Sequence, residues 1–209
     1  MTDRYKARSS CFDLIDVLFF NRVRTSPRTA LLSLVPESAT RILDVCAGTG
    51  SNSLVLAESR PDAAITALDL SADMLKVAED KFAKRNLANV ITVVADACNT
   101  GFDEQSFDVV VLSLTLHELD EVVRQRVLKE AKRILRDDGR MIVVEWQQPA
   151  KPFQRLLFSL VRATEPNGFE EFLRKDLVEY FAGYGFAVKG SRGCDYTQVL
   201  ELSKVQERS

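Results

Sequence analysis

The sequence predicts a single α/β domain built on a doubly wound, mostly parallel sheet. Over the first two thirds of the chain, five short runs rich in β-branched residues alternate with amphipathic helical segments. This alternation is typical of βαβ units, in which helices cover both faces of the sheet and the strands are apolar on both sides. Two later apolar runs, separated by glycines, predict an antiparallel hairpin at one edge of the sheet, so we expect seven strands.

The expected strands follow one another in chain order. Their ranges are 41–45, 64–68, 90–95, 107–112, 140–146, 186–189 and 196–202, with Gly190 and Gly193 between the last two. Residues 72–85 predict a helix, because their apolar side chains recur at helical spacing and Ser71 is a suitable N-cap. Residues 121–135 predict a second helix, and Asp138-Gly139 would end that unit.

Two further segments are expected to be helical. Residues 9–24 are rich in Phe and Leu, and residues 147–184 contain two helical stretches joined by residues 165–168. With no repeat or low-complexity linker, we expect one domain over residues 1–209. In it, residues 1–36 would form an N-terminal helical cap and residues 147–184 a helical insertion.

Composition excludes several classes of protein. The chain has 209 residues, 46% of them hydrophobic and 28% charged, and a net charge of -2. A nucleic-acid-binding domain normally carries a strongly basic face, so no nucleic-acid partner is expected. The four cysteines form no CxxC pair, so we expect no metal site. No stretch approaches the roughly 20 apolar residues of a membrane span, and the segment around Asp13 and Asp16 does not resemble a signal peptide, so we expect a cytoplasmic protein.

Three carboxylates at successive strand ends are the most informative feature. Asp44, Asp69 and Asp96 each lie at or near the carboxyl end of an expected strand. Ligands of open α/β sheets bind in the crevice outside these ends, so the three groups should face one crevice. That arrangement would favour a cationic ligand over a pyrophosphate. The alternative is that each aspartate only caps a helix or a loop.

The loop after the first strand is rich in small residues. Gly48 and Gly50 allow a positive φ and a close approach of the backbone to a ligand. The loop has no lysine, so it is not a phosphate-binding P-loop. A nicotinamide-binding fingerprint would want a third glycine where Ser53 stands.

These residues resemble the motifs of class I S-adenosylmethionine-dependent methyltransferases. Residues 42–50, ILDVCAGTG, are similar to the first motif of that family, although Cys46 stands where many members have glycine. Asp69 resembles the acidic residue that binds the ribose hydroxyls, and Asp96-Ala97 the pair that contacts the adenine edge. The resemblance covers roughly residues 30–146. It is greatest to the methyltransferases of ubiquinone and menaquinone biosynthesis and their small-molecule relatives.

The resemblance implies a Rossmann-like fold, S-adenosylmethionine as cofactor and S-adenosylhomocysteine as product. It also implies direct displacement of the methyl group from the sulfonium, with the protein aligning the donor and the acceptor. On this basis we expect a set of cofactor-binding residues. They are Asp44, Ala47, Gly48, Thr49, Gly50, Asp69, Leu70, Met74, Asp96, Ala97 and Ser113.

The acceptor is less well defined by the sequence. Residues 1–36 and 147–184 would cover the acceptor side, and their Phe and Leu content predicts an apolar pocket. Such a pocket would fit a small quinone precursor, an acyl-linked molecule or another lipophilic compound. The chain lacks the longer C-terminal region typical of the quinone enzymes. His117 and Glu145 are the candidate catalytic residues: His117 as a base or an acceptor-orienting group, and Glu145 as an orienting group. The alternatives are a structural hydrogen bond and a helix cap.

Two other functions remain open at this stage. A nicotinamide-dependent oxidoreductase shares the fold and the acidic residue on the second strand, but it gives Asp96 no role. A non-catalytic S-adenosylmethionine-binding module would keep the cofactor residues without turnover. We expect a monomer or a homodimer, with no integral membrane segment and with peripheral membrane contact left open.

Overall fold

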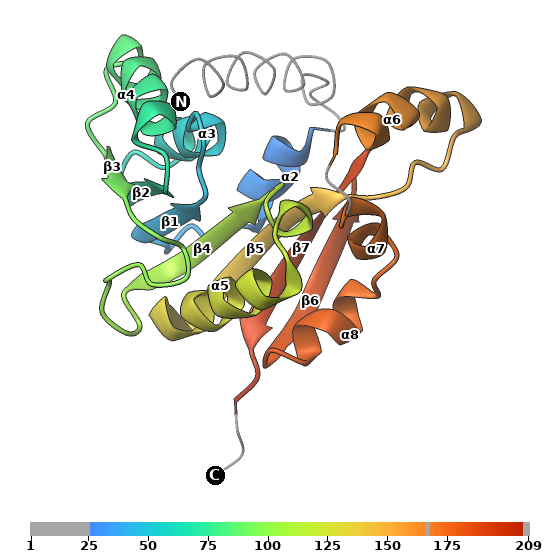
Figure 1. The fold of residues 1–209 in the computed structure, drawn as a ribbon. Coiled ribbons are helices and arrows are strands. Elements are labelled where there is room, and N and C mark those ends of the chain that lie inside the picture. Colours follow the sequence, from blue (N-terminus) through green and yellow to red (C-terminus); the bar gives the residue numbers. More distant parts are fainter. Residues whose placement is uncertain (1–25, 166–167, 207–209) are drawn as a thin grey trace.

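A computed structural model of the protein describes residues 26–165 and 168–206. One seven-stranded sheet runs through it, with helices on both faces (Figure 1). The strands are β1 (Arg41–Val45), β2 (Ala64–Asp69), β3 (Val90–Val94), β4 (Phe107–Ser113), β5 (Leu135–Trp146), β6 (Phe186–Gly193) and β7 (Thr197–Lys204). The helices are α2 (Pro27–Leu34), α3 (Ser51–Ser59), α4 (Ala72–Lys84), α5 (Glu121–Ile134), α6 (Pro152–Thr164), α7 (Phe169–Leu173) and α8 (Leu177–Ala182), with a 3₁₀ turn η1 (Leu116–Glu118).

The strand order confirms the predicted fold class. It is β3-β2-β1-β4-β5-β7-β6, and the first five strands are parallel to one another. Strands β5 and β7 pair antiparallel, as do β6 and β7, so the predicted hairpin lies at one edge. The order of the strands reverses between β1 and β4, and this switch point is where open α/β sheets leave a crevice at the carboxyl ends of the strands.

The two faces of the sheet bury alternate residues of the same strands. Leu43 and Val45 of β1 belong to the core cluster that includes α5 and α8, whereas Ile42 belongs to the cluster with α2 and α3. Helix α4 packs on the latter face as well, through Phe82 and its neighbours against Ala67 of β2. Because side chains of a strand point alternately to opposite faces, strands apolar on both sides need these two helical layers.

Helices α3 and α4 are held close together by a glycine. Gly50 precedes α3 with φ +73°, and a Cβ placed on it would lie 2.6 Å from Cβ of Ala78 and 2.7 Å from Cζ of Phe82. Helix α4 begins as predicted, because Oγ of Ser71 accepts a hydrogen bond from the amide of Met74. The loop before α3 and the start of α4 therefore have fixed positions at the carboxyl edge of the sheet.

Three elements differ from the ranges expected. Strand β5 begins at Leu135, directly after α5, so residues 135–139 extend the strand. Strand β6 continues through Gly190 and Gly193, with a register shift between Val188 and Gly190 that accommodates an unpaired residue. The second helical stretch of residues 147–184 is two helices, because the Asp176 side chain accepts hydrogen bonds from the first amides of α8 and starts a new helix there.

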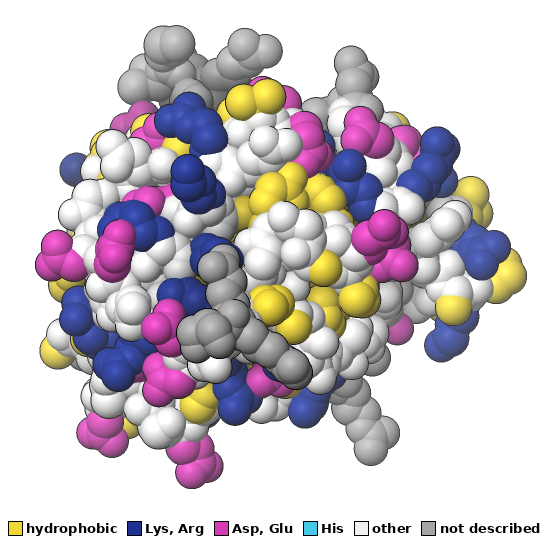
Figure 2. Space-filling view, turned by 90° about the horizontal axis from the view of Figure 1, so that it is seen from below, with side chains coloured by type: hydrophobic (Ala, Val, Ile, Leu, Met, Phe, Trp, Pro, Cys, Tyr) yellow, Lys and Arg dark blue, Asp and Glu magenta, His cyan; other side chains and the backbone are white. Residues whose placement is uncertain are grey.

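The first described helix lies against the sheet. Helix α2 contacts β5, β7 and α3, and Leu31 is fully buried. The helix expected over residues 9–24 lies outside the described residues. Within the described part, no helix is long and apolar enough to cross a membrane. The face seen from below in Figure 2 carries interspersed Lys, Arg, Asp and Glu side chains, with hydrophobic side chains between them.

Candidate functional site

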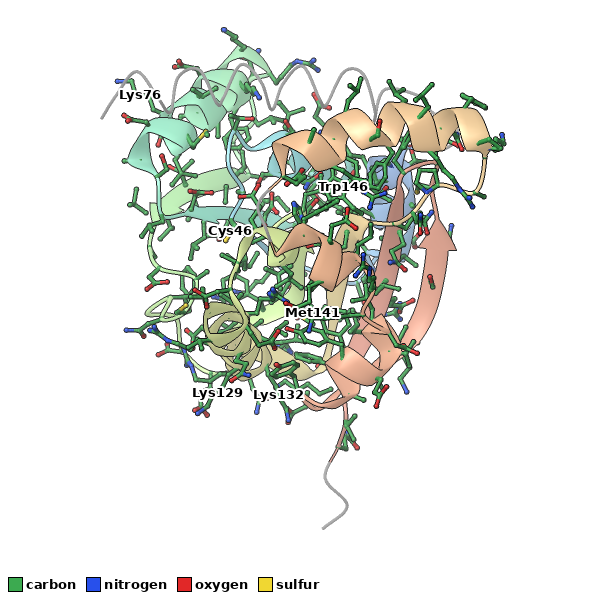
Figure 3. All side chains as sticks on the ribbon, turned by 45° about the vertical axis from the view of Figure 1, so that its right-hand side comes forward. Cys46, Lys76, Lys129, Lys132, Met141 and Trp146 are labelled. Carbon is green, nitrogen blue, oxygen red and sulfur yellow. The ribbon has the colours of Figure 1, made fainter. Side chains whose placement is uncertain are left out.

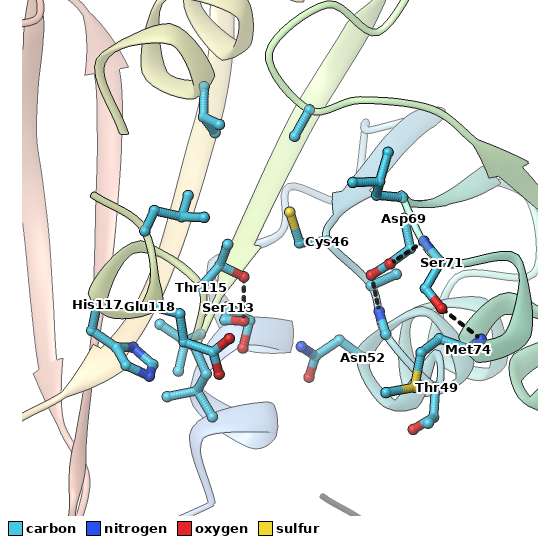
Figure 4. A pocket seen from close by; sticks show the side chains of 18 of the residues that line it. Cys46, Thr49, Asn52, Asp69, Ser71, Met74, Ser113, Thr115, His117 and Glu118 are labelled. Atoms are coloured by element: carbon cyan, nitrogen blue, oxygen red, sulfur yellow. Dashed lines mark hydrogen bonds between the residues drawn. The ribbon is translucent and has the colours of Figure 1, made fainter. Parts of the chain in front are cut away.

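A cavity of about 560 Å³ opens at the carboxyl ends of the central strands. This volume falls within the range usual for small-molecule sites. In Figure 4, Asp69, Ser71 and Met74 lie on one side of the pocket, while Ser113, His117 and Glu118 lie on the other. In Figure 3, Cys46 and Trp146 are seen toward this end of the sheet, and Met141 lies further back along β5. The cavity is where the switch point of the strand order places it.

Asp69 is anchored at the end of β2 by backbone donors. Its Oδ2 accepts a hydrogen bond from the amide of Gly48 at 2.8 Å, and its Oδ1 accepts one from the amide of Ser71 at 2.8 Å. Each carboxylate oxygen keeps a second lone pair, and the side chain lines the cavity. Asp69 can therefore accept hydrogen bonds from the hydroxyls of a ligand without losing its fixed orientation.

The loop between β1 and α3 places backbone in the cavity wall. Gly48 has φ +55°, and a Cβ at this position would meet nothing within 4 Å, so the space beside it is open. Cys46 also has a positive φ, 56°, which explains why glycine suits this position. Burial, together with the nearby carboxylates of Asp69 and Asp44, raises the pKa of the Cys46 thiol to about 12. The thiol is therefore protonated and unsuited to nucleophilic chemistry.

Asp96 lines the same part of the cavity as Asp69 and the loop after β1, which is here called the donor half. Its Oδ1 accepts a hydrogen bond from the amide of Cys98 at 2.8 Å, which closes a short turn after β3. Asp96, Ala97 and Cys98 all line the cavity. Asp69 and Asp96, two of the three strand-end aspartates, therefore line one crevice.

The third aspartate, Asp44, lies beneath the cavity and does not line it. Its side chain is 1% exposed, and Oδ2 accepts a hydrogen bond from Oγ of Ser53 at 2.6 Å. Burial raises the pKa of Asp44 to about 6, against the opposing effect of the Ser53 hydrogen bonds. Asp44 thus ties β1 to the first turn of α3, and its place supports the alternative in which an aspartate fixes a loop.

His117 is fixed at the opposite end of the cavity by Glu145. Nδ1 of His117 lies 2.7 Å from Oε2 of Glu145, and both side chains are almost fully buried. The other oxygen, Oε1 of Glu145, accepts hydrogen bonds from the amides of Thr115 at 3.2 Å and Leu116 at 2.8 Å. Glu145 itself does not line the cavity. It orients the turn after β4 and the imidazole together.

The second ring nitrogen of His117 also faces a carboxylate. Nε2 lies 3.3 Å from Oε2 of Glu165, which follows α6 and lines the cavity. Burial lowers the pKa of the imidazole, but the charges of Glu145 and Glu165 and their hydrogen bonds outweigh it, and the pKa rises to about 10. At neutral pH His117 is therefore an imidazolium, which favours an orienting role over that of a base.

Most of the residues expected at the site do line this cavity. Those that line it are Ala47, Gly48, Thr49, Asp69, Leu70, Met74, Asp96, Ala97, Ser113 and His117. Asp44, Gly50 and Glu145 stand behind the wall and position its parts. Of the described residues in 147–184, Glu165 alone contributes to the lining, and Pro27 and Arg28 contribute from the described part of residues 1–36.

Several polar lining residues were not expected from the sequence. They include Arg28, Ser51, Asn52, Thr115, Glu118 and Glu165. Carboxylate and imidazole atoms of His117, Glu118 and Glu165 come within 4.8 Å of one another. Glu118 directly follows His117 in the sequence, so its place beside a candidate catalytic residue could have identified it as a site residue. Glu165 is 48 positions further along the chain, and only the path of α6 brings it to His117.

Comparison with known proteins agrees with this geometry. Residues 42–139 match the family model described as "Methyltransferase domain". A demethylmenaquinone methyltransferase of Staphylococcus epidermidis is 30% identical over 168 residues, which are 80% of this chain and 68% of that protein. The homologous enzyme of Listeria monocytogenes is 31% identical over 145 residues, which are 69% of this chain and 60% of that protein.

Solved structures share the fold. A SAM-dependent methyltransferase from Aquifex aeolicus superimposes with a TM-score of 0.73 at 18% identity, covering 93% of this chain and 97% of that one. An O-methyltransferase from neocarzinostatin biosynthesis, in complex with S-adenosylhomocysteine and 1,4-dihydroxy-2-naphthoic acid, gives 0.68 at 20% identity, covering 84% and 53%. The strand order, the glycine loop beside Asp69 and these matches lead to one conclusion: the chain belongs to the class I S-adenosylmethionine-dependent methyltransferases.

Proposed function

We propose that this protein transfers the methyl group of S-adenosylmethionine to a small acceptor, one of quinone-precursor or naphthol type. The observation that carries the proposal is the anchored Asp69 carboxylate beside the open backbone at Gly48, in a cavity large enough for a nucleoside and a second small molecule. The family's cofactor supplies an electrophilic methyl group on a sulfonium. The protein's residues then bind the nucleoside and align the acceptor.

The charged side chains that line the cavity suit a ligand with a net positive charge. Asp69 and Asp96 line the donor half, and Glu118 and Glu165 line the other half, against Arg28 and the His117 imidazolium. Four carboxylates against two cations favour a sulfonium with an ammonium group over a pyrophosphate. Asp69 keeps free lone pairs for ribose hydroxyls, and the turn at Asp96-Ala97 can contact a base edge.

The proposed acceptor class follows from the far half of the cavity. Leu114, Leu119, Val144 and Trp146 give it apolar walls, while Thr115 and Glu118 add polar groups. An apolar ring system with one or two hydroxyls matches such walls. Demethylmenaquinone methyltransferases among the relatives, and the naphthoic acid bound to a structural neighbour, support the same class.

Calorimetry followed by turnover tests this function. The purified chain is titrated with S-adenosylmethionine, S-adenosylhomocysteine and, for comparison, NADH. We expect heat with the first two and none with NADH, and the reverse would identify a nicotinamide enzyme. Transfer of labelled methyl to 1,4-dihydroxy-2-naphthoic acid or to 2-naphthol is then followed. Binding of the donor with no transfer to any naphthol, phenol, amine or lipid fraction would leave a binding module only.

A further inference from the structure

Glu165 brings the connection between α6 and α7 into the cavity. The side chain is 13% exposed, lines the cavity and lies with Oε2 3.3 Å from Nε2 of His117. Of the described residues that follow β5, Glu165 alone lines the cavity. A carboxylate in that place needs an explanation, because burying a charge costs free energy unless it is paired.

Because His117 is paired with two glutamates, neither of its ring nitrogens is left to bind the molecule that receives the methyl group. Nδ1 is held by Glu145 and Nε2 faces Glu165, so both ring nitrogens are directed at carboxylates. Glu145 is in turn fixed by the backbone amides of the turn after β4. The ring is thus locked in orientation. Of the three groups in this line, Glu165 is the one whose carboxylate is at the cavity wall and is not held by backbone donors in the described structure.

We propose that Glu165 is the general base that removes the proton of a hydroxyl-bearing acceptor, and that His117 is the residue that positions Glu165. This inference rests on the proposed function and specifies its acceptor as a neutral phenol or enol. General acid–base catalysis by a placed carboxylate requires that it reach the proton, and Glu165 lies in the acceptor half of the cavity.

The chemical step balances within the site. The proton of the acceptor O–H passes to the Glu165 carboxylate, and the acceptor oxygen forms a bond to the methyl carbon. The sulfur–methyl bond breaks, and its electron pair stays on sulfur. Glu145, His117 and Glu165 together carry two negative charges and one positive charge before the step, and after it their net charge is zero.

Charges around Glu165 favour a neutral acceptor. Glu118 is close by, because one imidazole nitrogen of His117 and one carboxylate oxygen each of Glu118 and Glu165 lie within 4.8 Å of one another. Arg28 also lines the cavity. An ionised carboxylate only accepts hydrogen bonds, so Glu118 and Glu165 have nothing to donate to an acceptor oxygen that is already anionic. A neutral hydroxyl can donate its hydrogen bond to Glu165 and then lose its proton to it.

A series of hydroxynaphthalenes tests the proposal. Turnover is measured for 2-naphthol, which is neutral at the assay pH, and for a nitro-substituted 2-naphthol that is already ionised. We expect E165Q to lower kcat by about 10²–10⁴-fold for the neutral acceptor, and much less for the ionised one. Glu171 lies on α7 with its side chain 69% exposed, so E171Q serves as the matched control and should leave both rates unchanged.

Further arms separate the possible outcomes. E165D, which keeps a carboxylate, should recover part of the rate with 2-naphthol. If Glu165 were only structural, E165Q would lower the rates with the neutral and the ionised naphthol equally. A selective loss in E118Q instead of E165Q would overturn the proposal, as would a requirement for added Mn²⁺ that EDTA abolishes. Intact calorimetric binding of S-adenosylmethionine with no methylation of any naphthol would also overturn it, while leaving donor binding intact. No binding of the donor would refute the proposed function itself.

Discussion

The amide of Gly48 donates a hydrogen bond to Oδ2 of Asp69 over 2.8 Å, so the loop after β1 and the end of β2 hold each other in place. The two residues are 21 positions apart in the chain: Gly48 follows β1, and Asp69 ends β2, which pairs parallel with β1. The glycine loop and the acidic residue that recur in the family's sequence pattern are therefore one structural unit. A ligand that contacts Asp69 meets an already ordered backbone, which limits the entropy lost on binding.

Replacing Asp69 tests this unit directly. D69A should weaken the binding of S-adenosylhomocysteine by about tenfold or more, because ligand hydroxyls and the Gly48 amide lose their acceptor. Isothermal titration calorimetry measures the change. D62A, in the exposed turn before β2, is the matched control and should bind as the unaltered protein does. Equal affinity of D69A and D62A would show that the nucleoside lies elsewhere.

The protonation of His117 can be followed without ambiguity, because it is the single histidine of the chain. Since its pKa is raised to about 10, the ring protons in NMR spectra should not titrate between about pH 6 and 9, where an ordinary histidine does. E145Q keeps an oxygen for the amides of Thr115 and Leu116 but loses the charge, so the midpoint should move downward. A wild-type midpoint near the ordinary value would contradict the ion pairs described here.

This raised pKa also sets the sign of a stability change. The folded protein binds the His117 proton more tightly than the unfolded chain, so the stabilisation is full below about pH 6.5, the ordinary pKa of histidine. It is lost as the pH rises through about 10. The difference in unfolding free energy between the unaltered protein and E145Q should therefore shrink as the pH rises toward 10.

Glu130 predicts the opposite dependence at acidic pH. Hydrogen bonds from Arg133 lower the pKa of its carboxyl most, and those from Thr100 add to this, so the pKa falls to about 2. Because the folded pKa lies below the unfolded one, the stabilisation is present above about pH 4.5 and is lost as the pH falls toward 2. The gap in urea unfolding free energy between the unaltered protein and E130Q should narrow as the pH falls from about 4.5 toward 2, and a constant gap would refute this.

Replacing Gly50 tests the close packing of α3 on α4, which the structure shows and the sequence does not. G50A combines a strained left-handed backbone, about 1–2 kcal/mol, with overpacking against Ala78 and Phe82, about 1–3 kcal/mol more. Gly101 has a similar φ of +77° with nothing within 4 Å of a Cβ, so G101A carries the backbone strain alone. Urea denaturation should rank G50A below G101A. Equal stabilities would mean that α3 and α4 are not in tight contact at Gly50.

Periodicity made the parallel part of the fold predictable. Strand β1 and helix α4 fall within a residue or two of the ranges expected, because runs apolar on both faces and an amphipathic helix with a serine cap are strong local signals. The start of β5 and the split between α7 and α8 were not predicted. Residues 135–139 read as a turn because of Asp138-Gly139, and only pairing with the neighbouring strand extends them.

The donor half of the site was predictable for a similar reason, and the acceptor half was not. Asp69 and Asp96 follow strands whose ends must meet, so the topology alone brings them together. Asp44 also lies near a strand end in the sequence, but its side chain accepts a hydrogen bond from Ser53 and stays buried below the crevice. Glu165 meets His117 only through the tertiary course of α6, which no local pattern encodes.

One feature of the cavity wall gives the protein its own optical probe. Trp146 is the single tryptophan of the chain, 4% exposed, and its indole lies 6.5 Å from the His117 ring between their centroids. Intrinsic fluorescence therefore reports from one place, beside a cationic quencher and the space proposed for the acceptor. Deprotonating His117 at high pH or filling that space should change the emission, so occupancy can be read during turnover without any added label.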